Sequence, residues 1–251
     1  MLVGALLAVP AASRATHPLI TDDAGTQGKG KFQLEMNGQY DSDKESVDGV
    51  SVKTRGGQAA VTLSYGIVDN VDLVAGLPYQ WGKIEEDDAA ASDEQGISDM
   101  VIEAKWRFFE HNGFNLALKP GISIPTGNET KGLGTGKIGG HLFLIGSAEI
   151  APWAFHINLG YIRNENKADE RENLWHASLA TTWEFVKKLK FVTNIGIESN
   201  PDTGTSTDPA FILGGIIYSL AENFDLDFGI KYGLNSSETD CSLMAGIAVR
   251  F

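Results

Sequence analysis

The chain has little cysteine, little positive charge and no long apolar run. Its single cysteine, Cys241, excludes an intramolecular disulfide framework and any metal site built from clustered cysteines. No apolar run approaches the roughly 18 to 20 residues that a membrane-spanning helix needs, so helical membrane spans are excluded. Lys and Arg number 20 against 33 Asp and Glu, a formal net charge of −13. Because an acidic chain without a basic patch cannot neutralise phosphates, nucleic acid is not an expected partner.

The first fifteen residues form an apolar stretch that ends in small residues. Residues 1–9 are apolar or Gly, and Pro10 is followed by Ala-Ala-Ser-Arg-Ala at 11–15. This pattern is typical of a secretory signal peptide, here truncated at its start because no basic n-region precedes it. We expect cleavage after Ala15 and a mature chain from Thr16. A buried N-terminal helix is the alternative, which the proline disfavours.

Strict alternation of apolar and polar residues dominates the chain from Lys31 onward. Between Asp225 and Leu234, the even positions are all apolar or aromatic and the odd positions are all charged or Gly. A period of two is that of a β-strand with one apolar and one polar face, and not the 3.6 of a helix. The pattern predicts twelve strands, near 31–40, 57–67, 71–82, 98–109, 114–124, 138–149, 153–163, 173–185, 189–199, 209–220, 224–234 and 241–251.

The links between these strands alternate in length. Links of a few residues are expected near 68–70, 110–113, 152, 186–188 and 221–223. Long polar loops are expected after Tyr40, Trp81, Ile124, Ile162, Glu198 and Leu234. Long loops at one end and tight turns at the other are the layout of an outer-membrane barrel. The sequence therefore predicts an all-β fold, a single transmembrane antiparallel β-barrel of about 12 strands over 31–251, with short periplasmic turns and longer extracellular loops. Residues 16–30 precede it, as a periplasmic segment or a plug of the lumen.

A soluble two-sheet sandwich also alternates and is the alternative fold. Its polar face would be rich in Lys, Glu and Thr, whereas here that face carries Gly and Asn among scattered charges. Aromatic residues gather at the strand ends, as in the girdles that anchor a barrel at the two membrane interfaces. The last strand ends at Phe251, with apolar residues at every second position before it, which resembles the assembly signal of outer-membrane barrels. We expect the outer membrane of a Gram-negative bacterium, with its lipid and the barrel-assembly machinery as partners.

Four segments resemble one family of outer-membrane proteins. They are His17 to Thr26 (HPLITDDAGT) with Gly28 to Glu35 (GKGKFQLE), Gly76 to Tyr79 (GLPY), Ile124 to Gly127 (IPTG), and the hairpin from Tyr218 to Gly233. Through them, nearly the whole mature chain resembles the MetA-pathway of phenol degradation family of transporter-like barrels. The resemblance implies a barrel that passes small, aromatic or otherwise hydrophobic compounds, without identifying the compound.

Ionisable residues on the predicted polar faces are candidates for lining the lumen. Glu103, Lys105 and Arg107 share the polar face of one strand. Other strands contribute Lys119, Glu184, Lys190, Asp225, Asp227 and Lys231. Mixed signs in a confined lumen favour ion pairs across the barrel, which either stabilise a narrow barrel or form polar walls along a path. A twelve-stranded barrel is wider than a filled eight-stranded one and narrower than an open porin, so we expect a narrow channel for small-molecule solutes.

Three other patterns could hold a metal or nucleotide. His141, His156 and His176 lie on polar faces but lack the spacing of a ligand motif, so solvated lumen residues are the preferred interpretation. The acidic stretch from Glu85 to Gln95 has carboxylates for calcium but no EF-hand spacing, and we expect a solvated loop. Gly132 to Gly136 is followed by no helix or Lys-Ser/Thr pair that would reach a phosphate. No metal site and no cofactor are predicted.

An enzyme is the rival functional class, because some twelve-stranded outer-membrane barrels are phospholipases. A serine nucleophile needs a base within hydrogen-bond reach. Ser147 and His141 are both expected to point inward but lie six residues apart, about 20 Å along a strand. We predict no catalytic residues and a passive channel. A structural or adhesive barrel and an outer-membrane hydrolase remain the alternatives.

Overall fold

The computed structural model describes residues 17–47 and 49–251, and the predicted signal peptide lies outside these residues. The strands are β1 (Phe32–Val47), β2 (Val50–Val68), β3 (Val71–Glu86), β4 (Ala89–Ile97), β5 (Met100–His111), β6 (Phe114–Ile124), β7 (Gly139–Ile150), β8 (Trp153–Arg163), β9 (Asn173–Val186), β10 (Leu189–Glu198), β11 (Ala210–Ala221), β12 (Phe224–Gly233) and β13 (Cys241–Arg250). A short 3-10 helix, η1 (Glu129–Lys131), lies between β6 and β7. Within the described ranges, no helix is long and apolar enough to span a membrane.

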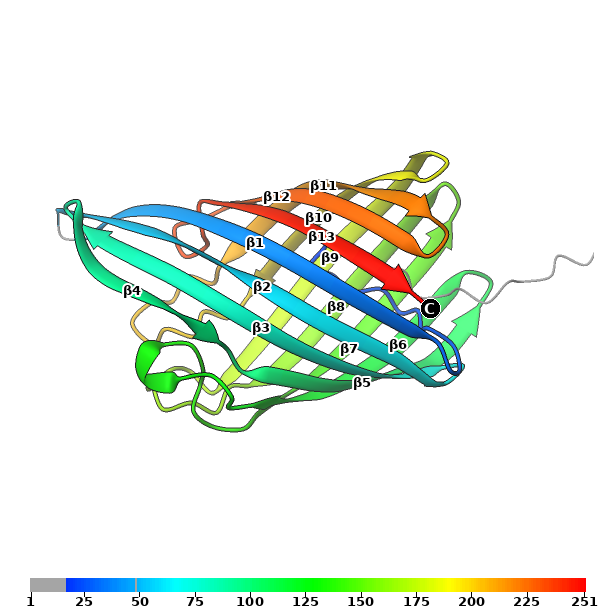
Figure 1. Cartoon of the computed structure of the whole chain (residues 1–251), viewed down its shortest axis with the longest axis horizontal. Helices are drawn as coiled ribbons and strands as arrows, with labels where there is room; N and C mark the ends of the chain where they lie inside the picture. Colours follow the sequence, from blue (N-terminus) through cyan, green and yellow to red (C-terminus); the bar gives the residue numbers. More distant parts are fainter. Residues whose placement is uncertain (1–16, 48) are drawn as a thin grey trace, which may run out of the picture.

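Twelve of the 13 described strands close into one antiparallel ring (Figure 1). The first and last strands meet at a seam, where β1 pairs with β13 and the Phe32 backbone N–H donates to the Phe251 carbonyl at 2.7 Å. Pairing of β2 with β3 and of β3 with β5 completes the ring. The predicted all-β antiparallel barrel is therefore confirmed.

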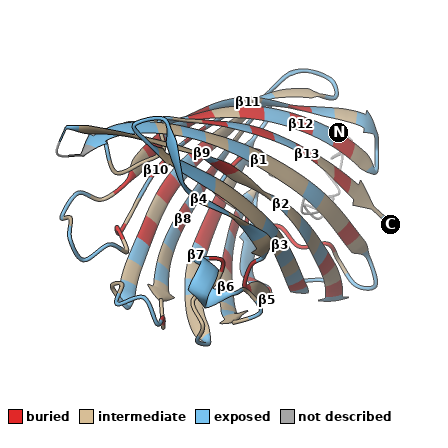
Figure 2. Cartoon of the chain, turned by 60° about the vertical axis from the view of Figure 1, so that its left-hand side comes forward, coloured by how far each residue is buried: buried red, intermediate tan, exposed pale blue. Residues whose placement is uncertain are grey.

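The two faces of each strand differ in the way that lipid outside and a filled lumen inside require. On β12, Phe228 points outward and is 45% exposed, whereas Asp227 points inward and is 8% exposed. Buried and exposed residues alternate in this way along the strands of the wall (Figure 2). Apolar side chains cover the outer surface and polar ones are enclosed, which is the reverse of a soluble sandwich.

Short turns lie at one end of the barrel and most long loops at the other. The short connections are residues 69–70, 112–113, 151–152, 187–188 and 222–223. The long ones are residues 125–138, 164–172, 199–209 and 234–240. This agrees with the alternation that the sequence predicts, and it assigns the short turns to the periplasmic end.

Two of the loops predicted as long are instead strand. The acidic stretch from Glu85 to Gln95 continues β3, turns at Asp87 and Asp88 with φ of 46° and 67°, and returns as β4. β4 pairs with the outer half of β3, whereas β5 pairs with β3 only over residues 71–76, so β4 is an extra strand outside the ring. Likewise, β1 continues past Tyr40 to Val47, and β2 begins at Val50.

The prediction was wrong at these hairpins because they are polar on both faces. They reach beyond the other strands at the left of Figure 1, and residues such as Lys83, Glu85 and Glu94 leave no apolar face to mark a strand. Backbone pairing still holds them together, since their N–H and C=O groups need partners wherever the chain runs.

Candidate functional site

Residues 17–30, called the inner segment below, lie against the inner wall of the barrel. The backbone N–H groups of Ile20 and Thr21 donate to Asn194 Oδ1 at 2.8 and 3.0 Å, and the Ala24 N–H donates to Ser147 Oγ at 2.9 Å. Inward-facing side chains thus satisfy backbone donors that have no strand partner. Near the periplasmic turn, the Lys29 N–H donates to Asp69 Oδ1 at 3.1 Å.

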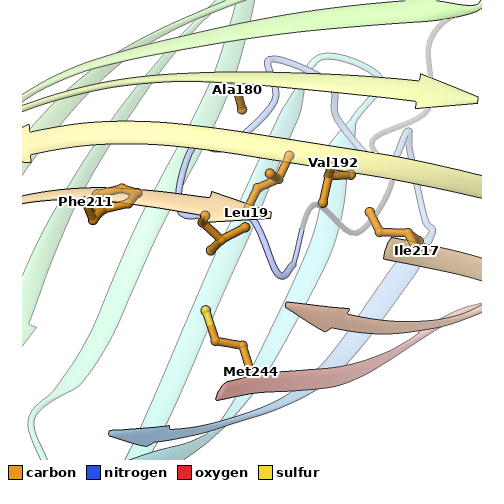
Figure 3. Close-up of a cluster of buried hydrophobic side chains, with 7 residues drawn as sticks. Leu19, Ala180, Val192, Phe211, Ile217 and Met244 are labelled. Carbon is orange, nitrogen blue, oxygen red and sulfur yellow. The ribbon is translucent and has the colours of Figure 1, made fainter. Parts of the chain in front are cut away.

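A small apolar core inside the barrel holds one end of the inner segment. Leu19 packs among inward-facing residues of β9, β10, β11 and β13 (Figure 3), namely Ala180, Val192, Phe211, Leu213, Ile217 and Met244. Pro18 lies so close to the wall that a Cβ atom at Gly229 would be 2.7 Å from Pro18 Cβ. A glycine is therefore needed there for the segment to lie against β12.

Sequence reasoning did not identify this core. Phe211, Leu213 and Ile217 face inward on β11, while Ile212 and Ile216 face outward. Because both faces of β11 are apolar, the polar face expected of a strand that lines water is missing. That missing face was the available signal for a packed partner inside the lumen.

Acidic residues of the inner segment bind two lysines that the sequence predicts to line the lumen. Asp22 pairs with Lys105 at 3.0 Å and with Lys119 at 3.2 Å. Lys105 also lies 3.5 Å from Asp23, and Lys119 lies 3.1 Å from Glu103. Burial by itself would raise the pKa of Asp22, but the two ammonium groups together hold it below its ordinary value. Asp22 is therefore ionised at neutral pH and cross-links the segment to β5 and β6.

The remaining predicted lumen residues lie in other places. At the periplasmic end, Arg107 is 3.1 Å from Glu110, Asp225 pairs with Arg250, and Glu184 is exposed beside the β9–β10 turn, opposite Lys190 in register. Asp227 pairs with His17 of the inner segment. Toward the extracellular end, Lys231 pairs with Glu238 at 2.7 Å. The predicted residues therefore form several local pairs and not one continuous charged wall.

A polar cavity of about 250 Å³ lies between the inner segment and the wall formed by β1, β2, β3, β5 and β6. The inner segment contributes His17, Leu19, Ile20, Asp22 and Gln27, and the wall contributes Gln33, Glu35, Asn37, Thr62, Ser64, Asp72, Val74, Glu103, Lys105 and Lys119. The opposite wall, from β9 to β13, contacts the segment through the apolar core and through polar side chains such as Asn194 and Asp227. The lumen is thus filled on one side and hollow on the other.

A cluster of three rings adjoins this cavity. Phe143 lies between His141 and His176, with centroid distances of 5.5 and 5.8 Å. His141 Nε2 hydrogen-bonds to Glu103 Oε1 at 2.8 Å, and Glu103 lines the cavity. His176 Nδ1 hydrogen-bonds to Glu198 at 3.0 Å. The cluster offers aromatic edges and hydrogen-bonding groups beside the cavity.

The structure also gives Ser147 a histidine partner that sequence reasoning missed. Ser147 Oγ is 2.8 Å from Nδ1 of His156, and the two residues pair directly across the β7–β8 hairpin. Both lie equally far from the tight turn predicted near Pro152, and residues equally far from a hairpin turn face each other across the two strands. The predicted turn was therefore the signal that could have identified the pair. Ser147 Oγ also accepts the hydrogen bond from the Ala24 backbone N–H. The pair therefore anchors the inner segment to the β7–β8 hairpin.

The extracellular end holds a second, wider cavity of about 490 Å³, with Gln58, Trp81, Glu94 and Leu133 in its lining. The loop of residues 125–138 closes one side of it. Lys131 of this loop pairs with Glu94 of β4 at 2.8 Å. β4 is outside the ring and pairs with β3 along one edge. The loop of residues 125–138 lies beside the other edge of β4.

Comparisons with known proteins agree with this architecture. A family model described as "Putative MetA-pathway of phenol degradation" matches residues 18–251. An outer membrane channel from Pseudomonas putida F1 is 15% identical, with 89% of this chain and 96% of that chain covered and a TM-score of 0.67. The translocator domain of autotransporter NalP from Neisseria meningitidis is 14% identical, with 89% of each chain covered and a TM-score of 0.57. The NanC porin is 10% identical, with coverages of 86% and 98% and a TM-score of 0.57. No curated protein matches the chain.

Proposed function

The chain belongs to the MetA-pathway of phenol degradation family and is a bacterial outer-membrane β-barrel, and on that premise we propose that it is a passive channel for small compounds. The observation that carries this proposal is the polar cavity beside the inner segment. An adhesive or purely structural barrel needs no hollow polar side in its lumen. A channel needs a path lined by groups that replace the hydration of a solute.

We further propose that the solutes include small aromatic compounds. The family description supports this class, and so does the ring cluster at Phe143. Ring edges and faces at about 5 to 6 Å suit offset or edge-on contact with another aromatic group. Glu103, shared between the ring cluster and the cavity, connects the two along one path.

Liposome swelling tests both parts of this proposal. Reconstituted protein should admit small solutes, and it should admit an aromatic solute faster than an aliphatic one of equal size and charge. Phe143→Ala should lower that preference, whereas Phe155→Ala, an outward-facing control, should not. Absence of swelling with every solute would favour the structural or adhesive barrel, and fatty acid release from the vesicles would favour the hydrolase.

We also propose that Phe251 is recognised by the barrel-assembly machinery. Phe251 is exposed at the seam and stacks on Phe32 at a centroid distance of 5.6 Å. Deleting Phe251 should lower the amount of heat-modifiable barrel in outer-membrane fractions while synthesis and export continue, and Phe251→Tyr should restore the yield. A normal barrel yield after the deletion would contradict the role.

A further inference from the structure

The polar cavity beside the inner segment carries more negative than positive groups. Its lining includes four carboxylates, Asp22, Glu35, Asp72 and Glu103, and two ammonium groups, Lys105 and Lys119. With His17 counted as neutral, the formal charge of the lining is 2 − 4 = −2. In a confined space with low-dielectric walls, a charge of this sign attracts cations and repels anions.

The two lysines are already neutralised by close partners. Lys105 contacts Asp22 and Asp23, and Lys119 contacts Asp22 and Glu103. Ammonium groups held this closely by carboxylates contribute little net attraction for a passing anion. The excess charge of the cavity therefore belongs to its other two carboxylates.

Those two carboxylates, Asp72 and Glu35, differ in their partners. Asp72 accepts hydrogen bonds from the Gln27 backbone N–H at 3.1 and 2.9 Å, which holds it against the inner segment. Glu35 lies on the β1 wall, where it has a side-chain hydrogen bond to Gln33 but no ion pair with any residue that the structure describes. Glu35 is thus the carboxylate best placed to meet a solute.

A second, independent observation is that one hydroxyl on the wall beside Glu35, that of Ser64, lacks a hydrogen-bond partner. Ser64 lines the same cavity from β2 and is only 7% exposed. Its hydroxyl has no hydrogen-bond partner among the described side chains and backbone groups. This hydroxyl is not among the side-chain atoms that are sealed from solvent, so water or a solute in the cavity can supply its missing partner.

We propose that this cavity is the selective part of the solute path and favours cations, with Glu35 as the specificity-determining residue. The solute class is a small cation. It is either an inorganic ion or an organic ammonium compound that also carries a hydrogen-bond acceptor for the Ser64 hydroxyl. The cavity volume of about 250 Å³ corresponds to roughly eight water molecules and admits a solute of that size. This inference rests on the proposed channel function and names the charge of its preferred solutes.

The reversal potential of the reconstituted full-length protein in a potassium chloride gradient tests the inference. The wild type should prefer potassium over chloride. Glu35→Gln should lower the potassium-to-chloride permeability ratio at least about two-fold, because the focused field weakens. Thr62→Asp, which places a carboxylate opposite Glu35 in register, should raise the ratio. Opposite shifts from two substitutions in one place cannot both arise from misfolding.

Glu222→Gln is the matched control, since Glu222 is exposed in the turn between β11 and β12 and outside the cavity. It should leave the ratio unchanged. Conductance with an unchanged ratio in Glu35→Gln, or a wild-type preference for chloride, would overturn the inference while leaving the channel function intact. Absence of conductance in the wild type would instead overturn the channel function itself.

Discussion

The two sides of the lumen are built differently although one barrel encloses both. On the side of β9 to β13, Leu19 and Pro18 pack against apolar side chains and a glycine. On the side of β1 to β6, polar side chains surround a cavity of about 250 Å³. The filled side resembles the core of a soluble protein, and the hollow side resembles a pore.

If the proposed channel function holds, this difference lets a narrow barrel be both stable and permeable. Apolar packing fixes the inner segment at one wall, since burial of apolar surface is favourable wherever water is excluded. Charged pairs to Asp22 then span the lumen and set how far the segment stands from the opposite wall. The remaining gap is the cavity, so the segment itself defines the width of that cavity.

Removal of the segment should have the largest effect. A variant without residues 17–24 loses Leu19 and Asp22 together, and both sides of the lumen become hollow. We expect single-channel conductance to rise several-fold and the preference for cations to fall, because Lys105 and Lys119 lose their shared carboxylate. A deletion variant that is folded and heat-modifiable but conducts like the wild type would show that the segment does not limit the path.

Asp22→Asn should have the next largest effect. The substitution removes the shared partner of two buried lysines, while Asp23 and Glu103 still contact one lysine each. We expect a loss of about 2 kcal/mol in the free energy of unfolding, below the roughly 3 to 5 kcal/mol for a broken, fully buried pair. Denaturant titration from bilayers measures this loss. Asp208→Asn, in an extracellular loop, is the control for a general effect of charge removal.

Enlarging a wall residue should distinguish the two sides directly. Gly229→Leu places a side chain where Pro18 already lies and should destabilise by about 1 to 3 kcal/mol through overpacking. Thr62→Leu faces the cavity and should fill free space, with little loss of stability but lower conductance. Equal destabilisation by both substitutions would contradict the contrast between a filled and a hollow side.

The Asp22 pairs should withstand mild acid. Because the pKa of Asp22 is lowered from its ordinary value of 3.8, the stability it contributes is fully present above that value and is lost as the pH falls through the lowered pKa. From about pH 8 to about pH 5, the difference in unfolding free energy between wild type and Asp22→Asn should stay constant. A difference that shrinks within that window would contradict the assignment of Asp22 as a stably ionised group.

The smallest effect is expected outside both sides of the lumen. Lys131 and Glu94 form an exposed pair at the extracellular end, and exposed pairs add little to stability. Lys131→Gln should leave the unfolding midpoint and the charge selectivity unchanged. A shift in selectivity would mean that the extracellular cavity, and not the one beside the inner segment, discriminates between solutes.

The sequence alone determined the barrel, because a wall between lipid and lumen imposes a period of two on each membrane-spanning strand. Alternation from Asp225 to Leu234 specified which face of β12 meets lipid, and tight turns such as the one near Pro152 specified the hairpins. The same alternation did not predict the outer parts of the β1–β2 and β3–β4 hairpins. Both faces of these hairpins meet water, so no alternation of apolar and polar residues is required there.

Tertiary structure decided what lies inside the barrel. Alternation says that Lys105 and Asp227 face inward, but it does not orient Leu213, whose strand is apolar on both faces, and it says nothing about which distant residue each of the three contacts. The partners of these residues, Asp22, His17 and Leu19, come from a segment without periodicity, and only closure of the ring brings them within contact distance. The division of the lumen into a filled and a hollow side therefore depends on contacts between residues up to 210 positions apart, which no local pattern encodes.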